Sequence, residues 1–241
     1  MNDLEGKVIL VAGASSGMGR ATAKAAAAAG ARLVLFARRA DQLANVQRMI
    51  KNAGGQAKSI SGDATEAGDV ATAVRCATDS YGRLDVLVNC VGTNIKDRAL
   101  SRLTHDAWSQ LLRTNLDAAF ALTQAVLPTF RSQHNGLLIH IASSAAKRAD
   151  ASGVGYQASK AGVAALASAT MLEERMNGIR VTVLFPGFTA TPMVENRPVP
   201  PTSDELSKAL QPGDIAHLCM AVIRLPHRAY VPEIVLSPSQ P

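Results

Sequence analysis

Short apolar runs alternate with longer stretches of helix-forming residues along most of the chain. The run at 8–12 is wholly apolar, as expected for a parallel strand buried on both faces. The alanine-rich segment at 21–29 favours a helix, and Gly30 stands where it could end that helix. The same alternation predicts strands at 32–37, 57–62, 84–88, 137–142, 179–185 and 231–236, and helices at 41–53, 66–81, 115–130, 155–177 and 215–225, with a further helix that begins after Thr104 and turns Trp108 and Leu111 inward.

This order of elements predicts the fold class. Strands that alternate with helices indicate an α/β protein, a single doubly wound Rossmann-like domain over residues 1–241 with a parallel sheet of about seven strands and helices on both faces. The stretch at 188–212 is rich in proline and has little periodicity. Long loops in compact domains are usually functional, so we predict a lid over a substrate site there; a plain surface connection is the alternative.

Composition excludes several classes of protein. The chain is 47% hydrophobic and 18% charged, which is ordinary for a globular domain, and no apolar run is long enough to span a membrane. The acidic first residues do not resemble a signal peptide, and the three cysteines form no C-x-x-C motif, so we expect a cytoplasmic protein without disulfides. Neither the cysteines nor the five histidines have the spacing of metal ligands, and no metal is expected.

The net charge of +6 raises the question of nucleic-acid binding. The basic residues are dispersed rather than gathered in one stripe, and only 4% of the residues are aromatic. Both features argue against a nucleic-acid partner. A mild basic excess suits an anionic cofactor or substrate equally well.

A glycine-rich turn follows the first predicted strand. Gly13, Gly17 and Gly19 have the spacing G-x-x-x-G-x-G, which differs from the dinucleotide fingerprint G-x-G-x-x-G. Glycines let the backbone approach a phosphate, and the following helix offers free N–H groups and the positive end of its dipole. Taken alone, the pattern is equally compatible with a structural turn.

Arg38 follows the end of the second predicted strand. An acid near this position holds the ribose 2′-hydroxyl of NAD, whereas an arginine accommodates the 2′-phosphate of NADP. Ala37 stands where the acid would be expected, so the pattern favours NADP(H). A solvated arginine pair, Arg38 and Arg39, is the alternative.

Tyr156 and Lys160 are separated by one helical turn and therefore share a helix face. A phenol has a pKa of about 10, and a nearby ammonium favours its ionised form. Such a pair can exchange a proton with a carbonyl or an alcohol. Ser143, with Ser144 as a rival, follows the fifth predicted strand, where open α/β sheets bind their ligands.

Together these motifs resemble the short-chain dehydrogenase/reductase family. That family has a Thr-Gly-x-x-x-Gly-x-Gly loop, an Asn-Asn-Ala-Gly segment after the fourth strand, a helix asparagine, a serine and Tyr-x-x-x-Lys. Matching residues stand in the same order at 12–19, at 89–92, at Asn115, at Ser143 and at Tyr156 with Lys160. The step from Ser143 to Tyr156 fits the family and favours Ser143 over Ser144. Ala12, Cys90 and Val91 depart from the pattern, and Val91 is larger than the alanine that the family has beside the cofactor ribose.

The resemblance implies an NADP(H)-dependent oxidoreductase acting on a small carbonyl or alcohol substrate. Ser143 would orient the carbonyl, Tyr156 would donate the proton, Lys160 would hold the ribose and lower the Tyr156 pKa, and Asn115 would hold a water. The expected cofactor-binding residues are Gly13, Ser15, Ser16, Gly17, Met18, Gly19, Arg38, Asp63, Ala64, Asn89, Tyr156, Lys160, Pro186, Gly187, Thr189 and Thr191.

Two further expectations concern the pocket and the assembly. Phe188, Met193, Val194 and the loops 93–96 and 145–150 are expected to line the substrate pocket. Lys147 and Arg148 could attract a carboxylate, and a solvated loop is the favoured alternative for this pair. The resemblance also implies a homo-oligomer that pairs through the helices of Asn115 and Tyr156. A non-catalytic NADP(H)-binding sensor or scaffold on the same fold is the rival function.

Overall fold

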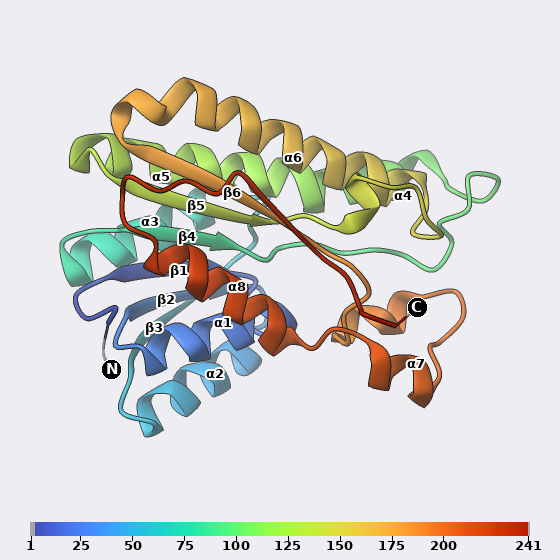
Figure 1. The fold of residues 1–241 in the computed structure, drawn as a ribbon, viewed down its shortest axis with the longest axis horizontal. Helices are drawn as coiled ribbons and strands as arrows, with labels where there is room; N and C mark the ends of the chain where they lie inside the picture. Colours follow the sequence, from blue (N-terminus) through green and yellow to red (C-terminus); the bar gives the residue numbers. More distant parts are fainter. Residues whose placement is uncertain (1–2, 241) are drawn as a thin grey trace.

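A parallel sheet of seven strands forms the centre of the computed structural model, which describes residues 3–240 (Figure 1). The strands are β1 (Val8–Ala12), β2 (Arg32–Ala37), β3 (Gln56–Ser61), β4 (Val86–Asn89), β5 (Gly136–Ile141), β6 (Ile179–Pro186) and β7 (Glu233–Leu236). Their order is β3-β2-β1-β4-β5-β6-β7, and every pair is parallel. The predicted fold class is confirmed.

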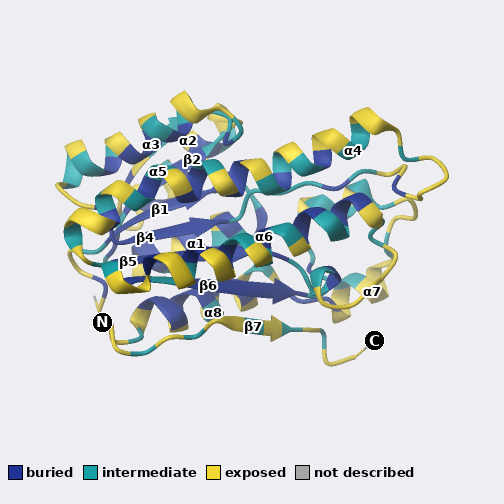
Figure 2. Cartoon of the chain, turned by 90° about the horizontal axis from the view of Figure 1, so that it is seen from above, coloured by how far each residue is buried: buried dark blue, intermediate teal, exposed yellow. Residues whose placement is uncertain are grey.

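Helices cover both faces of this sheet (Figure 2). On one face lie α1 (Gly17–Ala28), α2 (Ala40–Asn52) and α8 (Pro212–Arg224), and on the other lie α3 (Ala67–Tyr81), α5 (Ala118–Gln133) and α6 (Val154–Glu174). Successive strand side chains point to opposite faces, so Ile9 and Val11 join the first apolar layer while Val8 and Leu10 join the second. The sheet is thus buried on both sides, which explains why β1 at its centre is a continuous apolar run.

The direction in which strands are added to the sheet reverses beside β1. This reversal marks the part of the sheet where a binding site is expected. From β1 the chain moves outward to β2 and β3, and then returns to add β4 on the other side of β1. The loops after β1 and β4 therefore diverge at the carboxyl edge of the sheet. In open α/β sheets, ligands bind in this crevice.

Two local features near the site differ from the sequence expectations. Helix α1 begins at Gly17 rather than at 21, because the glycine loop itself forms its first turn. A short helix, α7 (Ser203–Lys208), lies inside the stretch expected to be irregular. Thr202 and Glu205 cap it reciprocally, a signal that is visible in the sequence.

The helix expected after Thr104 is α4 (His105–Leu112), and the Thr104 hydroxyl accepts a hydrogen bond from the Ala107 N–H. Leu111 is buried as expected, whereas Trp108 is only partly buried. A π-helical turn, Arg113–Asp117, then joins α4 to α5. Within residues 3–240 we find no helix with the length and apolar character needed to cross a membrane.

Candidate active site

Tyr156 and Lys160 lie on the buried face of α6, one turn apart. Tyr156 is 9% exposed and Lys160 is 3% exposed, and the Lys160 Nζ lies 6.0 Å from the centroid of the Tyr156 ring. The ammonium donates a hydrogen bond to the Ile141 carbonyl oxygen at the end of β5, at 3.0 Å. Burial lowers the pKa of Lys160 from 10.5 to about 8. The pair is thus anchored at the carboxyl edge of the sheet by a helix and a strand.

Asn115 reaches this pair from the π-helical turn. Its Oδ1 accepts from the Thr93 N–H at 2.7 Å, while its Nδ2 donates to the Thr93 carbonyl and to the Ser159 hydroxyl at 2.9 Å. A Cβ added to Gly92 would lie 2.9 Å from the Lys160 Nζ and 3.4 Å from the Asn115 Oδ1, so Gly92 keeps the space between them open. Single π turns often occur at functional sites because they shift side chains from helical register.

Ser143 lies at the end of β5, facing the same cavity as Tyr156. Its hydroxyl accepts a hydrogen bond from the Ala145 N–H at 3.2 Å, which orients the side chain at the start of the following 3₁₀ turn. Burial raises the pKa of Tyr156, and a hydrogen bond with the Ser143 side chain opposes that rise. Lys160 was expected to lower this pKa, yet in the structure the shift is upward because burial outweighs the neighbouring groups.

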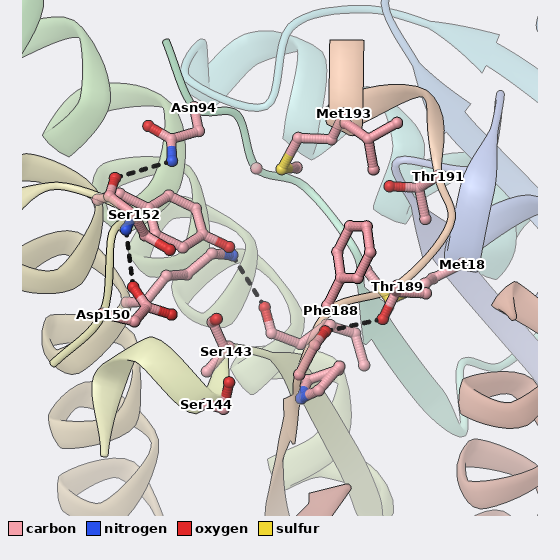
Figure 3. Close-up of a pocket in the computed structure, with 18 of the residues that line it drawn as sticks. Met18, Asn94, Ser143, Ser144, Asp150, Ser152, Phe188, Thr189, Thr191 and Met193 are labelled. Atoms are coloured by element: carbon pink, nitrogen blue, oxygen red, sulfur yellow. Dashed lines mark hydrogen bonds between the residues drawn. The ribbon is translucent and has the colours of Figure 1, made fainter. Parts of the chain in front are cut away.

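Ser143, Tyr156 and Lys160 line a cavity of about 160 Å³ at the carboxyl edge of the sheet, and Asn115 lies behind its wall. Figure 3 shows how Ser143, Asp150, Phe188 and Met193 approach it from different loops. The expected wall residues Phe188, Met193 and Val194 are there, with Asn94 and Asp150 from the two expected loops. Two arginines that the sequence did not single out, Arg98 and Arg197, also line it.

Beneath the cavity, a hydrogen-bonded chain holds the loop after β4. The Asn89 Oδ1 accepts from the Val91 N–H, so the Asn89 Nδ2 is the atom 3.2 Å from the His140 Nδ1. Nδ1 must then accept, and the His140 Nε2 donates to Thr123 Oγ1, also at 3.2 Å. Complete burial lowers the pKa of His140 from 6.5 to about 4. Sequence reasoning missed His140 because no motif marks it.

The glycine loop leaves a cradle that a dinucleotide phosphate could enter. A Cβ on Gly13 would come within 2.9 Å of the Cys90 backbone, and a Cβ on Gly19 would come within 2.3 Å of the Gly13 carbonyl oxygen. Gly13 and Gly17 also have positive φ angles of 78° and 52°, which favour glycine. Most of the remaining residues predicted to bind cofactor line the adjoining cavities: Ser15, Ser16, Gly17, Met18, Gly19, Arg38, Asp63, Ala64, Gly187, Thr189 and Thr191, with Pro186 beside Gly187.

The two arginines after β2 take different partners. The Arg39 Nη2 donates to the Ser16 hydroxyl at 2.8 Å and to the Ser15 hydroxyl at 3.2 Å. The Arg38 Nη1 lies 3.8 Å from the Asp63 Oδ2, and both arginines line a cavity of about 180 Å³ with those serines. The sequence singled out Arg38, but Arg39 is the arginine joined to the glycine loop.

Lys147 and Arg148, for which a carboxylate site and a solvated loop are the two interpretations, are exposed and lie apart from the cavity wall. The Lys147 Nζ forms an ion pair with Glu233 at 2.5 Å and lies 4.5 Å from the centroid of the Phe185 ring. Arg148 is exposed, and neither residue lines the cavity that holds Tyr156. Among residues 3–240, no group of three or more His, Cys, Asp or Glu side chains could hold a metal ion.

Three features define the class of protein: the strand order, the glycine loop that opens α1, and the Tyr156–Lys160 pair at the carboxyl edge. It is that of dinucleotide-binding oxidoreductases built on a doubly wound parallel sheet.

Comparison with known proteins identifies the family. Residues 7–200 match the family model described as short chain dehydrogenase. The chain is 32% identical over 235 residues to the 3-oxoacyl-[acyl-carrier-protein] reductase of Synechocystis sp., an alignment that covers 96% of this chain and 94% of that protein. The chain therefore belongs to the short-chain dehydrogenase/reductase family, whose members are oxidoreductases that use nicotinamide cofactors.

Solved structures agree with this assignment. A metagenomic short-chain oxidoreductase in complex with NADP is 30% identical, with a TM-score of 0.85 over 99% of this chain and 100% of that one. An alcohol dehydrogenase from the archaeon Thermococcus sibiricus, complexed with 5-hydroxy-NADP, is 26% identical, with a TM-score of 0.87 over 97% of both chains.

Proposed function

We propose that this protein is an NADP(H)-dependent reductase of carbonyl groups, or a dehydrogenase of the corresponding alcohols, in which Tyr156 transfers the proton. The observation that carries the proposal is the convergence of Ser143, Tyr156 and Lys160 on one cavity beside the glycine loop. The end of β5 supplies Ser143, α6 supplies Tyr156 and Lys160, and the turn after β1 supplies the glycine loop, so their meeting does not follow from local sequence.

The described residues fit a nicotinamide dinucleotide. The glycine loop offers its phosphate cradle, Asp63 and Ala64 line the cavity beside it, and Thr189 and Thr191 line the cavity that Tyr156 faces. When bound, the reduced cofactor supplies the hydride for the substrate carbon. Lys160, whose ammonium already lies at this edge, would hold the ribose hydroxyls.

The chain's own residues would then complete the reduction. The Ser143 hydroxyl would donate to the substrate carbonyl oxygen and hold it near Tyr156. As the carbonyl carbon gains hydride, its oxygen would take the proton from the Tyr156 hydroxyl, giving an alcohol and a phenolate. The positive charge of Lys160 would stabilise that phenolate. Asn115 would position a water that returns a proton to the site.

Two observations support NADP(H) rather than NAD(H). No acid stands at the end of β2, where Ala37 is followed by Arg38 and Arg39. The two solved relatives described above contain NADP or a derivative of it. An arginine at this position suits a 2′-phosphate through its fixed charge and forked donors.

The segment 188–212 is proposed to act as a lid. Phe188, Met193 and Val194 line the cavity, and a bridge between Thr189 and Leu210 joins the two ends of the segment to each other. From outside the segment, the Arg98 side chain donates to the Asn196 carbonyl oxygen within it. The rival function, a non-catalytic sensor or scaffold, is not favoured, because a protein that only binds cofactor needs no proton donor on the wall of a second cavity.

Substitution of Tyr156 by phenylalanine tests the proposal. Tyr156→Phe removes only the hydroxyl, so we expect kcat for NADPH-dependent carbonyl reduction to fall at least about a hundred-fold, the lower range for a general acid. NADPH binding, followed by its fluorescence, is expected to persist. Tyr230→Phe, at a side chain that is 40% exposed, is the matched control. Turnover near the wild-type value in Tyr156→Phe would contradict the assignment.

A further inference from the structure

Arg98 is a buried cation in the wall of the catalytic cavity. It is 9% exposed and lies in the loop between β4 and α4. Its Nε donates to the Ile95 carbonyl oxygen at 2.9 Å, and its Nη2 donates to the Asn196 carbonyl oxygen. Both acceptors are neutral, and among residues 3–240 no carboxylate lies within 4.0 Å of this guanidinium.

A buried charge without a counter-ion is unusual in a folded protein. Removing a cation from water is costly, and most buried charges are paired. Burial lowers the pKa of Arg98 and the nearby charge of Arg197 lowers it further, while the more distant carboxylate of Asp150 opposes this shift without pairing with the guanidinium. The guanidinium still has N–H groups that donate to no described residue, since only its Nε and Nη2 make hydrogen bonds. An anion in the cavity would satisfy them.

The backbone is built to hold Arg98 in this position. Gly153, directly before α6, has a φ angle of 87°, and a Cβ there would lie 2.6 Å from the Arg98 carbonyl oxygen and 2.7 Å from the Arg98 Cβ. Arg98 thus packs tightly against the start of the helix that carries Tyr156. The positive charge of Arg98 also acts on Tyr156, whose pKa it lowers.

Arg197 places a second cation beside the first. Its guanidinium carbon lies 4.3 Å from the centroid of the Phe188 ring, a cation–π contact that holds the side chain on the proposed lid. Arg98 and Arg197 line both the catalytic cavity and the outer cavity next to it. Asp150 is the acidic residue among those that line the catalytic cavity, and its Oδ1 accepts from the Ser152 N–H.

We propose that Arg98, assisted by Arg197, binds a carboxylate of the substrate, so that the preferred substrates are small oxo acids and the corresponding hydroxy acids. This rests on the proposed function, because the carbonyl of the same molecule must reach Ser143 and Tyr156. The cavity of about 160 Å³ suits a compact molecule, since drug-sized ligands occupy roughly 300–1,000 Å³. A guanidinium matches a carboxylate through two parallel hydrogen bonds.

The test compares oxo acids with their uncharged methyl esters as substrates. A panel of 2-oxo, 3-oxo and 4-oxo acids and the matching esters is reduced with NADPH, and kcat/KM is measured for each. We expect the wild type to prefer the best acid over its ester by about ten- to a hundred-fold, the range for a hydrogen bond to a charged group. In Arg98→Gln this ratio is expected to fall toward one.

The ratio separates recognition from structural support. If Arg98 only ties its loop to the lid through Asn196, Arg98→Gln would lower kcat/KM for acid and ester alike and leave the ratio unchanged, which would overturn the proposal. Arg197→Gln should lower the ratio less, and it serves as the second variant if Arg98→Gln does not fold. Arg148→Gln, at an exposed arginine outside the cavity, is the control and should keep the wild-type ratio.

The same experiment keeps the proposed function distinct. A wild type that reduces esters as well as acids would overturn the carboxylate proposal while supporting carbonyl reduction. A wild type that oxidises NADPH with no carbonyl in the panel, and whose Tyr156→Phe variant behaves identically, would overturn both.

Discussion

At the scale of single residues, the two arginines after β2 have different partners. Arg39 is fixed by the hydroxyls of Ser15 and Ser16, whereas Arg38 lies near Asp63 with 67% of its side chain exposed. Both can reach an anion in the cavity that they share. The choice of cofactor should therefore depend on both guanidinium groups.

Arg38→Ala and Arg39→Ala are each expected to lower kcat/KM for NADPH by about ten- to a hundred-fold and to change kcat/KM for NADH little. A charge-assisted hydrogen bond contributes roughly 1.5–3 kcal/mol, and only NADPH has the additional phosphate. Arg48→Ala, on the exposed face of α2, is the control. Equal losses with both cofactors, or a wild type that prefers NADH, would show that neither arginine recognises a 2′-phosphate.

At the scale of elements, β5 carries a titratable side chain through the middle of the sheet. All six of its residues are buried, and His140 is fully enclosed between Asn89 and Thr123. The Asn89 amide can only donate to the His140 Nδ1, so a proton on that nitrogen would face another donor. The folded protein therefore keeps His140 neutral.

The depressed pKa of His140 makes stability depend on pH in a definite direction. The unfolded chain binds this proton with a pKa near 6.5 and the folded chain only with a pKa near 4. The contribution of neutral His140 to the free energy of unfolding is therefore full above about pH 6.5 and is lost as the pH falls toward 4. Between pH 7 and 5 the free energy of unfolding is expected to fall by about 2 kcal/mol through this group.

Urea unfolding at both pH values, for the wild type and for His140→Gln, measures that difference. Glutamine retains a donor for Thr123 but does not titrate, so the variant should be less sensitive to pH by about the same amount. The carboxylates titrate in both proteins and cancel in the comparison. An identical pH dependence in the two proteins would show that His140 is not the group responsible.

The elements were largely predictable from the sequence because their signals are local. Each apolar run forms the predicted strand and each alanine-rich segment forms the predicted helix. The spacing of Tyr156 and Lys160 places both on one face of α6. The π-helical turn that aims Asn115 has no such signal, since its register depends on how α4 and α5 pack.

The side chains that the sequence missed depend on contacts between distant segments. Arg98 meets Asn196 across a separation of 98 residues, and His140 meets Asn89 across 51. No periodicity or short motif encodes which arginine turns into a cavity. Arg39 was overlooked for the same reason, because its serine partners lie 23 and 24 residues away.

At the scale of the whole molecule, the outer surface of α5 and α6 exposes large apolar side chains. Phe120 on α5 is 52% exposed, Leu172 on α6 is 66% exposed, and Met176 in the turn after α6 is 87% exposed. The two helices lie next to each other on one face of the sheet (Figure 1). Large apolar side chains exposed on neighbouring helices are candidates for an interface between copies of the chain, and members of this family commonly form oligomers.

We therefore expect two copies of the chain to pair through α5 and α6. Light scattering coupled to gel filtration should give the wild type a mass that is a multiple of 25.2 kDa, and Phe120→Glu combined with Leu172→Glu should reduce it to that value. Charged side chains placed in an apolar interface lose hydration without gaining partners. Val199→Glu, at a residue that is 77% exposed on the proposed lid, is the control and should leave the mass unchanged. A monomeric wild type, or a double variant with the wild-type mass, would contradict this arrangement.

Because α6 also carries Tyr156 and Lys160, dissociation should loosen the helix that positions these two side chains. We therefore expect the double variant, once dissociated, to have a lower kcat than the wild type.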